Sequence, residues 1–311
     1  MRSFEIQGHR GARGLFPENT LAGFRAALKT GVTSFELDVA ITADGIPVIA
    51  HDPTLNPDIT RTRDGAWLTT PGPAIRTLTL AELQTYEVGR INPASAYATL
   101  YPDQQPEDGA TIPTLAEVLA IDATIRFNIE IKSVPQRTDL TLPGPTMADA
   151  ALAIADALGV TARIWIESFD WSAPRHIKRT RPDVPVAWLT SPEHLKDARR
   201  WWNGPAPDDF NHSIPQAIAA EGGGTWAPHY KDLTQDQIAE AHQLGLKVLP
   251  WTVNDPEDMT RLITWHTDGL ITDRPDLLVR ALASMGLRPK PHQEALPPGP
   301  PLRAQPLEPF C

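Results

Sequence analysis

The stretch of sequence that decides the fold is Phe35-Glu36-Leu37-Asp38-Val39, followed across an Asp44-Gly45 turn by Ile46-Pro47-Val48-Ile49-Ala50-His51. Successive side chains of a strand point to opposite faces, so Glu36 and Asp38 leave one face and the apolar residues beside them leave the other. Two carboxylates this close raise each other's pKa unless a cation or a shared proton resolves the repulsion. The pattern therefore predicts a metal site or an acid/base pair, and the alternative is a strand with one solvated face.

The composition is that of an acidic globular chain. Its 311 residues suit one α/β barrel of about 250 residues or two ordinary domains. The net charge of −10 argues against a general affinity for nucleic acid or for an anionic membrane. No apolar run approaches the roughly 20 residues of a membrane-spanning helix, and the first residues lack the apolar core of a signal peptide. We therefore expect a protein without stable membrane association that is cytoplasmic, or periplasmic if a leader was removed. The single cysteine, Cys311, excludes an internal disulfide.

Apolar patterning alternates between strand and helix along most of the chain. Helices are expected where apolar residues recur at helical spacing, the first of them after Asn19 or Thr20 as N-cap and before Gly31. Strands are expected at 4–8, 35–39, 46–50, 126–132, 163–168, 185–189, 224–228, 247–253 and 269–272. Helices are expected at 80–86, 115–121, 147–158, 171–180, 235–244, 256–265 and 275–285.

This alternation predicts an α/β fold with a parallel sheet, either an open sheet or a (β/α)8 TIM barrel. The barrel is favoured because candidate catalytic residues lie at the carboxyl ends of several strands. The Asp44-Gly45 turn is too short for a helical crossover, so the barrel should be irregular around its second and third strands. We expect a barrel domain over 1–288, an inserted subdomain at about 52–112, and a disordered tail over 289–311, rich in proline.

Polar residues recur where the predicted strands end. His9 and Arg10 follow the first strand, His51 follows the third, and Glu130 and Lys132 repeat the two-residue spacing of Glu36 and Asp38. Three carboxylates without a cysteine suit one hard divalent cation, Mg²⁺ or Ca²⁺. Two histidines beside such a cation supply the acid and the base that cleavage of a phosphodiester needs, and an arginine and a lysine would neutralise the phosphate.

These residues stand in a series of ordered motifs that resembles the glycerophosphodiester phosphodiesterase family. The motifs are His9-Arg10-Gly11, Pro17-Glu18-Asn19-Thr20, Glu36-Leu37-Asp38-Val39, 44–52, Asn128-Ile129-Glu130-Ile131-Lys132, Ser168-Phe169, Trp251-Thr252-Val253-Asn254 and 268–275. The resemblance covers about residues 6 to 285 and implies an irregular (β/α)8 barrel with an insertion after His51.

The resemblance implies a role for each residue that matches. Glu36, Asp38 and Glu130 would bind the divalent cation, His9 and His51 would be the general acid/base pair, and Arg10 and Lys132 would contact the phosphate. Trp251 and Phe169 would line the pocket on the side of the glycerol or the head group. The implied reaction is metal-dependent hydrolysis of a glycerophosphodiester to sn-glycerol 3-phosphate and an alcohol, attacked by water or by the substrate's own 2-hydroxyl.

Two alternative functions are compatible with the same motifs, and several further residues have other expected roles. The chain could cleave lysophospholipids in the manner of a phospholipase D, or bind glycerophosphodiesters without turning them over. His229 is expected to be structural, Asp273 to cap the final helix, and Trp201 and Trp202 to pack, whereas His194 has no expected role.

Overall fold

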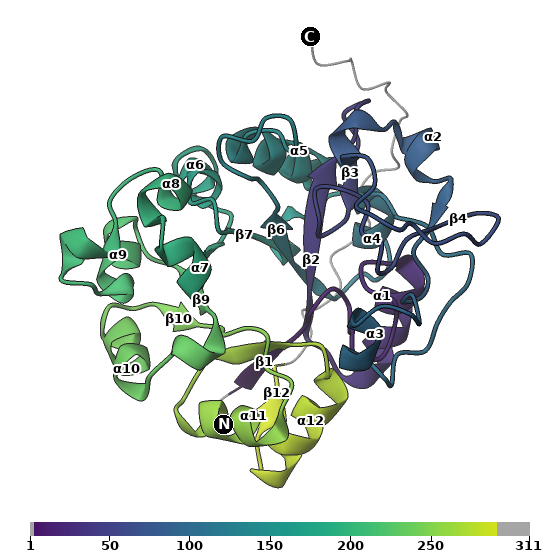
Figure 1. The fold of residues 1–311 in the computed structure, drawn as a ribbon. Coiled ribbons are helices and arrows are strands. Elements are labelled where there is room, and N and C mark those ends of the chain that lie inside the picture. The colour runs from purple at the N-terminus through teal and green to yellow at the C-terminus, as the bar shows by residue number, and fades with distance from the viewer. Residues whose placement is uncertain (1–2, 291–311) are drawn as a thin grey trace.

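The computed structural model describes residues 3–290 as a ring of parallel strands surrounded by helices, a (β/α)8 barrel (Figure 1). The neighbouring strands pair in parallel from β10 through β9, β8, β7, β6, β2 and β1 to β11. The predicted barrel is therefore confirmed. Its strands are β1 (Ser3–Gly8), β2 (Ser34–Ile41), β6 (Arg126–Ile131), β7 (Ile164–Ser168), β8 (Val186–Thr190), β9 (Thr225–Pro228), β10 (Lys247–Val248) and β11 (Gly269–Thr272).

The barrel closes between β10 and β11 through single hydrogen bonds instead of a regular ladder. Ile271 N donates to Pro250 O at 3.0 Å, and Val253 N donates to Ile271 O at 3.0 Å. The strand expected over 247–253 is thus regular only over its first two residues. The chain beyond Val248 still follows the barrel wall and brings Trp251 to the rim.

A helix covers each step between barrel strands. The first, α1 (Leu21–Ala27), begins at Thr20, whose side chain accepts a hydrogen bond from Gly23 N, and the short 3₁₀ turn that follows ends at Gly31, with φ of 91°. The predicted N-cap and stop are thereby confirmed. The other covering helices are α4 (Leu115–Leu119), α5 (Gly144–Ala157), α6 (Ser172–Thr180), α9 (Ile214–Ala220), α10 (Gln235–Gln243), α11 (Pro256–Thr264) and α12 (Pro275–Ser284), with α7 (Pro192–Leu195) and α8 (Ala198–Trp202) between β8 and α9.

The irregularity at the Asp44-Gly45 turn is a β-hairpin that stands outside the barrel. β3 (Pro47–Ile49) pairs antiparallel with the end of β2, with Val39 opposite Ile49. Gly45 adopts φ of 79°, the left-handed conformation that a tight hairpin turn favours. The hairpin runs past the barrel rim and returns, so that Ala50 N bonds Asp38 O at 2.9 Å. The returning strand thus places His51 beside the carboxylates of β2.

The inserted segment after His51 builds a small cap of its own over one side of the rim. It contains the two-stranded sheet β4 (Arg61–Thr62) and β5 (Tyr86–Glu87), and the helices α2 (Leu80–Leu83) and α3 (Tyr97–Leu100). The helix expected over 80–86 ends at Leu83, and α3 was not predicted. A second apolar cluster holds this cap, formed by Ala40, Val48, Ala50, Leu55, Ile75, Leu83, Val88 and Ile112.

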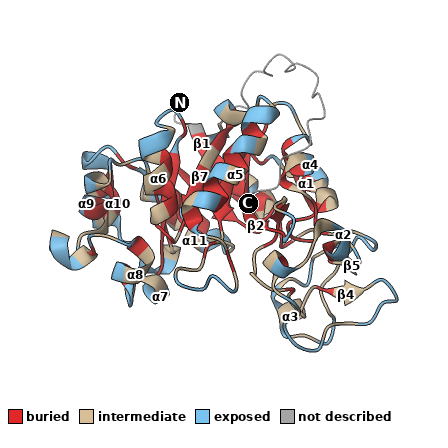
Figure 2. Cartoon of the chain, turned by 90° about the horizontal axis from the view of Figure 1, so that it is seen from above, coloured by how far each residue is buried: buried red, intermediate tan, exposed pale blue. Residues whose placement is uncertain are grey.

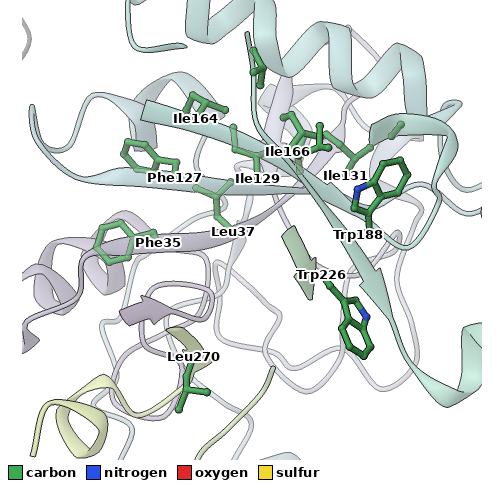
Figure 3. Close-up of a cluster of buried hydrophobic side chains, with 14 of the residues drawn as sticks. Phe35, Leu37, Phe127, Ile129, Ile131, Ile164, Ile166, Trp188, Trp226 and Leu270 are labelled. Atoms are coloured by element: carbon green, nitrogen blue, oxygen red, sulfur yellow. The ribbon is translucent and has the colours of Figure 1, made fainter. Parts of the chain in front are cut away.

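The two faces of the barrel strands differ in chemistry. Phe35, Leu37, Phe127 and Ile129 lie on the outward face of their strands and are buried in the main core (Figure 3). The barrel strands as a whole are mostly buried (Figure 2). The inward face of β1 and β6 is polar. Arg126 on β6 donates to Glu5 on β1 at 2.7 Å, and Asn128 on β6 donates to Gln7 on β1 at 3.0 Å. Hydrogen bonds and charges therefore order this side of the barrel interior.

The described chain ends at residue 290. A last short strand, β12 (Arg288–Pro289), pairs with β1, so that Pro289, the first residue of the predicted tail, is still ordered against the barrel. The rest of the predicted tail, residues 291–311, lies outside the described residues. Between residues 3 and 290, no helix is both long and apolar enough to span a bilayer.

Candidate active site

Three carboxylates meet inside the open end of the barrel. Asp38 lies opposite Glu130 in the register of β2 and β6, and Glu36 lies two residues before Asp38 on the same face. One oxygen from each lies within 4.8 Å of the others, and all three residues are buried. Glu36 Oε1 and Asp38 Oδ1 have no hydrogen-bond partner. Buried, unpartnered oxygens this close suit a divalent cation, because burial without a partner is costly for a carboxylate.

Two cations border this cluster. Arg10, whose backbone has φ of 50°, donates from its peptide N–H to Glu36 Oε2 at 3.0 Å, and its guanidinium lies 3.4 Å from Asp38 Oδ2. Lys132 Nζ donates to Glu130 Oε1 at 2.7 Å and lies 3.6 Å from Asp38 Oδ1. A second bond from Arg10, to Glu18 Oε1 at 2.8 Å, fixes the guanidinium.

His9 is oriented by a buried carboxylate at the end of β11. His9 Nδ1 lies 2.6 Å from Asp273 Oδ1, which leaves Nε2 3.7 Å from Glu36 Oε2. Arg13 donates two hydrogen bonds to Asp273, at 3.0 and 3.1 Å, and Asn254 Nδ2 donates a third at 2.7 Å. The expectation that Asp273 caps the last helix is wrong, because α12 begins after Arg274 and the Asp273 carboxylate turns inward.

His51 has an equivalent partner in the next residue. Its Nδ1 lies 2.9 Å from Asp52 Oδ1, and Asn56 holds the other oxygen of Asp52 at 2.7 Å. Both histidines therefore use Nδ1 to bind an aspartate and keep Nε2 for the site. Burial lowers the pKa of His9 to about 4, and burial together with the charges of Arg10 and Lys132 lowers that of His51 to about 4.

A fourth buried carboxylate, Glu167, was not predicted. It lies on β7 opposite Glu130, is 1% exposed, and has one oxygen without a partner. Burial, with the charge of Glu130, raises its pKa to about 8, and burial raises the pKa of Glu130 to about 7. The alternation of Ile164-Trp165-Ile166-Glu167 was the signal that could have found it.

The predicted residues come together around one cavity. Eight of the nine line a space of about 150 Å³, with Glu167 among the other lining residues, and the ninth, Asp38, is fully buried beside Glu36 and Glu130. A larger pocket of about 620 Å³ opens next to it and shares His51, Glu130, Lys132, Phe169 and Trp251. Phe169 and Trp251 meet edge to face, with ring centroids 5.4 Å apart.

Three residues that sequence reasoning set aside also line the larger pocket. His194, His229 and Trp201 border it, whereas Trp202 is fully buried in the core as expected. His194 stacks on the ring of Phe169 at 3.9 Å. It follows no strand directly, so position in the sequence gave no signal for it.

Buried acids, bases and cations at the carboxyl end of a (β/α)8 barrel are the arrangement of a barrel enzyme. Comparison with known proteins agrees. The model of the glycerophosphoryl diester phosphodiesterase family matches residues 9–277. A glycerophosphodiester phosphodiesterase of Caldanaerobacter subterraneus is 28% identical over 288 residues, which cover 90% of this chain and 98% of that protein.

Solved structures resemble the chain over nearly its whole length. A candidate glycerophosphoryl diester phosphodiesterase from Silicibacter pomeroyi has a TM-score of 0.84 and 38% identity, covering 92% of this chain and 95% of that one. A phosphodiesterase from Oleispira antarctica, solved with the product sn-glycerol-3-phosphate, has a TM-score of 0.65 and 24% identity, covering 90% of this chain and 96% of that one, and shows the same fold. The chain belongs to the glycerophosphoryl diester phosphodiesterase family. It is accordingly an enzyme of the phosphoric diester hydrolase class.

Proposed function

We propose that the chain hydrolyses glycerophosphodiesters to sn-glycerol 3-phosphate and an alcohol. The observation that carries the proposal is the placement of two histidines, each oriented by an aspartate, on a cavity beside a cluster of three buried carboxylates. The Oleispira relative was solved with sn-glycerol-3-phosphate, which supports the assignment of this product.

Glu36, Asp38 and Glu130 would hold one divalent cation, Mg²⁺ or Ca²⁺. Their donor set is all oxygen, and two of these oxygens are buried without a partner. When bound, the cation would act as a Lewis acid that neutralises negative charge on the phosphoryl oxygens. Arg10 and Lys132 would add positive charge on the same side, Arg10 through its guanidinium fork and Lys132 as a point charge.

His9 and His51 would transfer the protons. One imidazole takes the proton of the nucleophile, which is water or the glycerol 2-hydroxyl, and the other gives a proton to the oxygen of the departing alcohol. Asp273 and Asp52 stabilise the imidazolium form of the histidine each one binds. An anionic phosphodiester between the rings would raise the pKa of both histidines from the low values of the empty cavity. Phe169 and Trp251 would line the substrate side.

The proposal is tested by His9→Ala and His51→Ala. We expect each variant to lose about 10²–10⁴-fold in turnover of sn-glycero-3-phosphoethanolamine, the range for removal of a general acid or base. Cation affinity and the circular dichroism spectrum should be retained. His212→Ala is the matched control, because His212 is exposed on the outer surface and pairs with Asp208. Near-normal rates in both active-site variants would overturn the assignment.

A further inference from the structure

Five aromatic rings form a continuous row along the larger pocket, and two inner members of the row, Phe169 and Trp251, also line the catalytic cavity. The ring centroids of Trp201 and His194 are 4.4 Å apart, those of His194 and Phe169 are 3.9 Å apart, and those of Phe169 and Trp251 are 5.4 Å apart. His229 extends the row beyond Trp251 at 5.4 Å. We call Trp201, His194, Phe169, Trp251 and His229 the aromatic wall.

The aromatic wall is only half-buried, unlike the other large aromatic clusters of the described chain. Trp171, Trp188, Trp202 and Trp226 are almost completely buried and belong to the core. The wall residues instead line the pocket of about 620 Å³ and remain partly exposed. Exposed apolar surface in a concave site is a binding surface, and a pocket within the range of about 300–1,000 Å³ accommodates a ligand larger than a small polar alcohol.

Charged side chains of both signs line the pocket: Asp52, Glu130 and Glu193 are acidic, and Lys132 and Lys196 are basic. The ammonium group of Lys132 is already paired with carboxylates, with Nζ 2.7 Å from Glu130 Oε1 and 3.6 Å from Asp38 Oδ1. Glu193 and Lys196, of opposite sign, are exposed at the pocket border. His194 Nδ1 is hydrogen-bonded to Ser191 Oγ, and the two atoms are 2.7 Å apart. Burial and the charge of Lys132 lower the pKa of His194 to about 4, so the ring is uncharged at neutral pH.

We propose that the aromatic wall binds the alcohol half of the substrate, and that this alcohol is a bulky one with an apolar or planar face. The inference rests on the proposed function, since the pocket shares His51 and Lys132 with the catalytic cavity. Trp201 is the specificity-determining residue of this subsite. It does not line the catalytic cavity, and its ring meets the ring of His194, which in turn stacks on Phe169.

Two esters of sn-glycerol 3-phosphate with the same two-carbon linker test the proposal, the 2-phenylethyl ester and the ethanolamine ester. The wild-type protein should have a kcat/KM about tenfold higher for the phenylethyl ester, because one aromatic contact contributes a factor of about ten. Trp201→Ala should lower kcat/KM about tenfold for the phenylethyl ester and less than twofold for the ethanolamine ester. Trp201→Phe should restore part of the loss.

Trp67→Ala is the matched control, because Trp67 is a half-buried tryptophan of the insertion that packs under Arg61. It should change neither rate. Equal losses for both esters in Trp201→Ala, or no loss for either, would overturn the inference and leave the proposed function standing. A wild-type preference for the ethanolamine ester would overturn it as well, in favour of a cation site. Failure of the wild type to hydrolyse any of these esters would instead overturn the proposed function, and the inference with it.

Discussion

At the scale of single residues, the site contains more buried carboxylates than cationic side chains. Glu36, Asp38, Glu130 and Glu167 lie together, and the neighbouring cations are Arg10 and Lys132, of which Arg10 also binds Glu18. This excess negative charge is neutralised either by protons bound to the carboxylates or by a metal cation. Protons and a divalent cation therefore compete for the same oxygens, so the affinity for the cation should rise with pH.

This competition predicts a pH dependence for the metal-free protein. The pKa of Glu130 is raised to about 7 and that of Glu167 to about 8, so above pH 4.5 the folded state binds more protons than the unfolded state. Stability must then fall as pH rises through 7 and 8. His9 and His51, with pKa lowered to about 4, act in the opposite direction, but their contribution is complete above about 6.5.

Glu167→Gln tests this directly. In chelator, the melting temperature of the wild-type protein should fall between pH 6.5 and 8.5, and Glu167→Gln should remove a large part of that fall. Glu257→Gln, at the exposed start of α11, is the control and should follow the wild type. A wild-type melting temperature that rises over this interval would contradict the interpretation of the buried carboxylates.

A second residue-scale prediction concerns Asp273, which positions His9. Asparagine has the shape of aspartate, but it presents an N–H or a neutral oxygen to the His9 imidazole in place of a carboxylate. The imidazolium form of His9 is then no longer stabilised, so we expect Asp273→Asn to lower kcat about 10²–10⁴-fold with KM little changed. Asp149→Asn is the control, because Asp149 is an exposed aspartate that pairs with a histidine outside the site, at 2.8 Å from His176 Nε2. An equal fall in both variants, or a change confined to KM, would show that Asp273 does not act through His9.

At the scale of elements, the cap formed by the insertion is tied to the catalytic loop through α3. Tyr97 donates to Glu18 Oε2 at 2.5 Å and accepts from Arg13 Nη1 at 3.0 Å. Glu18 fixes Arg10 and Arg13 fixes Asp273, so one hydroxyl contacts the supports of two site residues. The insertion is therefore part of the site's framework.

Tyr97→Phe should destabilise the protein by about 1.5–3 kcal/mol, the cost of hydrogen bonds to charged groups. Urea unfolding measures this loss. Tyr101→Phe is the matched control, because the Tyr101 ring packs 4.8 Å from the Arg13 guanidinium and phenylalanine preserves that ring. If the free energy of unfolding falls equally in both variants, the loss comes from the packing of α3, and the proposed role of the Tyr97 hydroxyl between Glu18 and Arg13 is refuted.

The sequence predicts most elements because apolar periodicity and caps are local. Thr20 and Gly31 mark the ends of the first helical segment, and the two-residue spacing of Glu36 and Asp38 gives their common face. Tertiary contacts decide the rest. The absence of a helical crossover did not reveal the hairpin that returns His51 to Asp38. The short helix α3 has no periodic apolar pattern, and the contacts that hold it include those of Tyr97 with Arg13 and Glu18.

At the scale of the whole molecule, the barrel brings together residues that are far apart in the chain. The His9–Asp273 pair spans a sequence separation of 264 residues and joins β1 to β11 across the first and last strands of the barrel. From the local sequence, Asp273 could equally well cap the last helix or orient a histidine. Only the closed barrel, which brings Asp273 to His9, distinguishes the two roles. For the same reason His194 and Trp201 gain a place in the pocket only from the folding of α7 and α8 over the rim.

The central claim is that a divalent cation held by Glu36, Asp38 and Glu130 supports hydrolysis that leaves the phosphate on glycerol. The most direct measurement removes all metal with a chelator, then titrates Mg²⁺ or Ca²⁺ while sn-glycerol 3-phosphate release from its ethanolamine ester is followed. We predict no release in chelator, recovery at one cation per chain, and no recovery for Asp38→Asn. Full activity in chelator, or release of phosphoethanolamine and glycerol instead, would contradict the account.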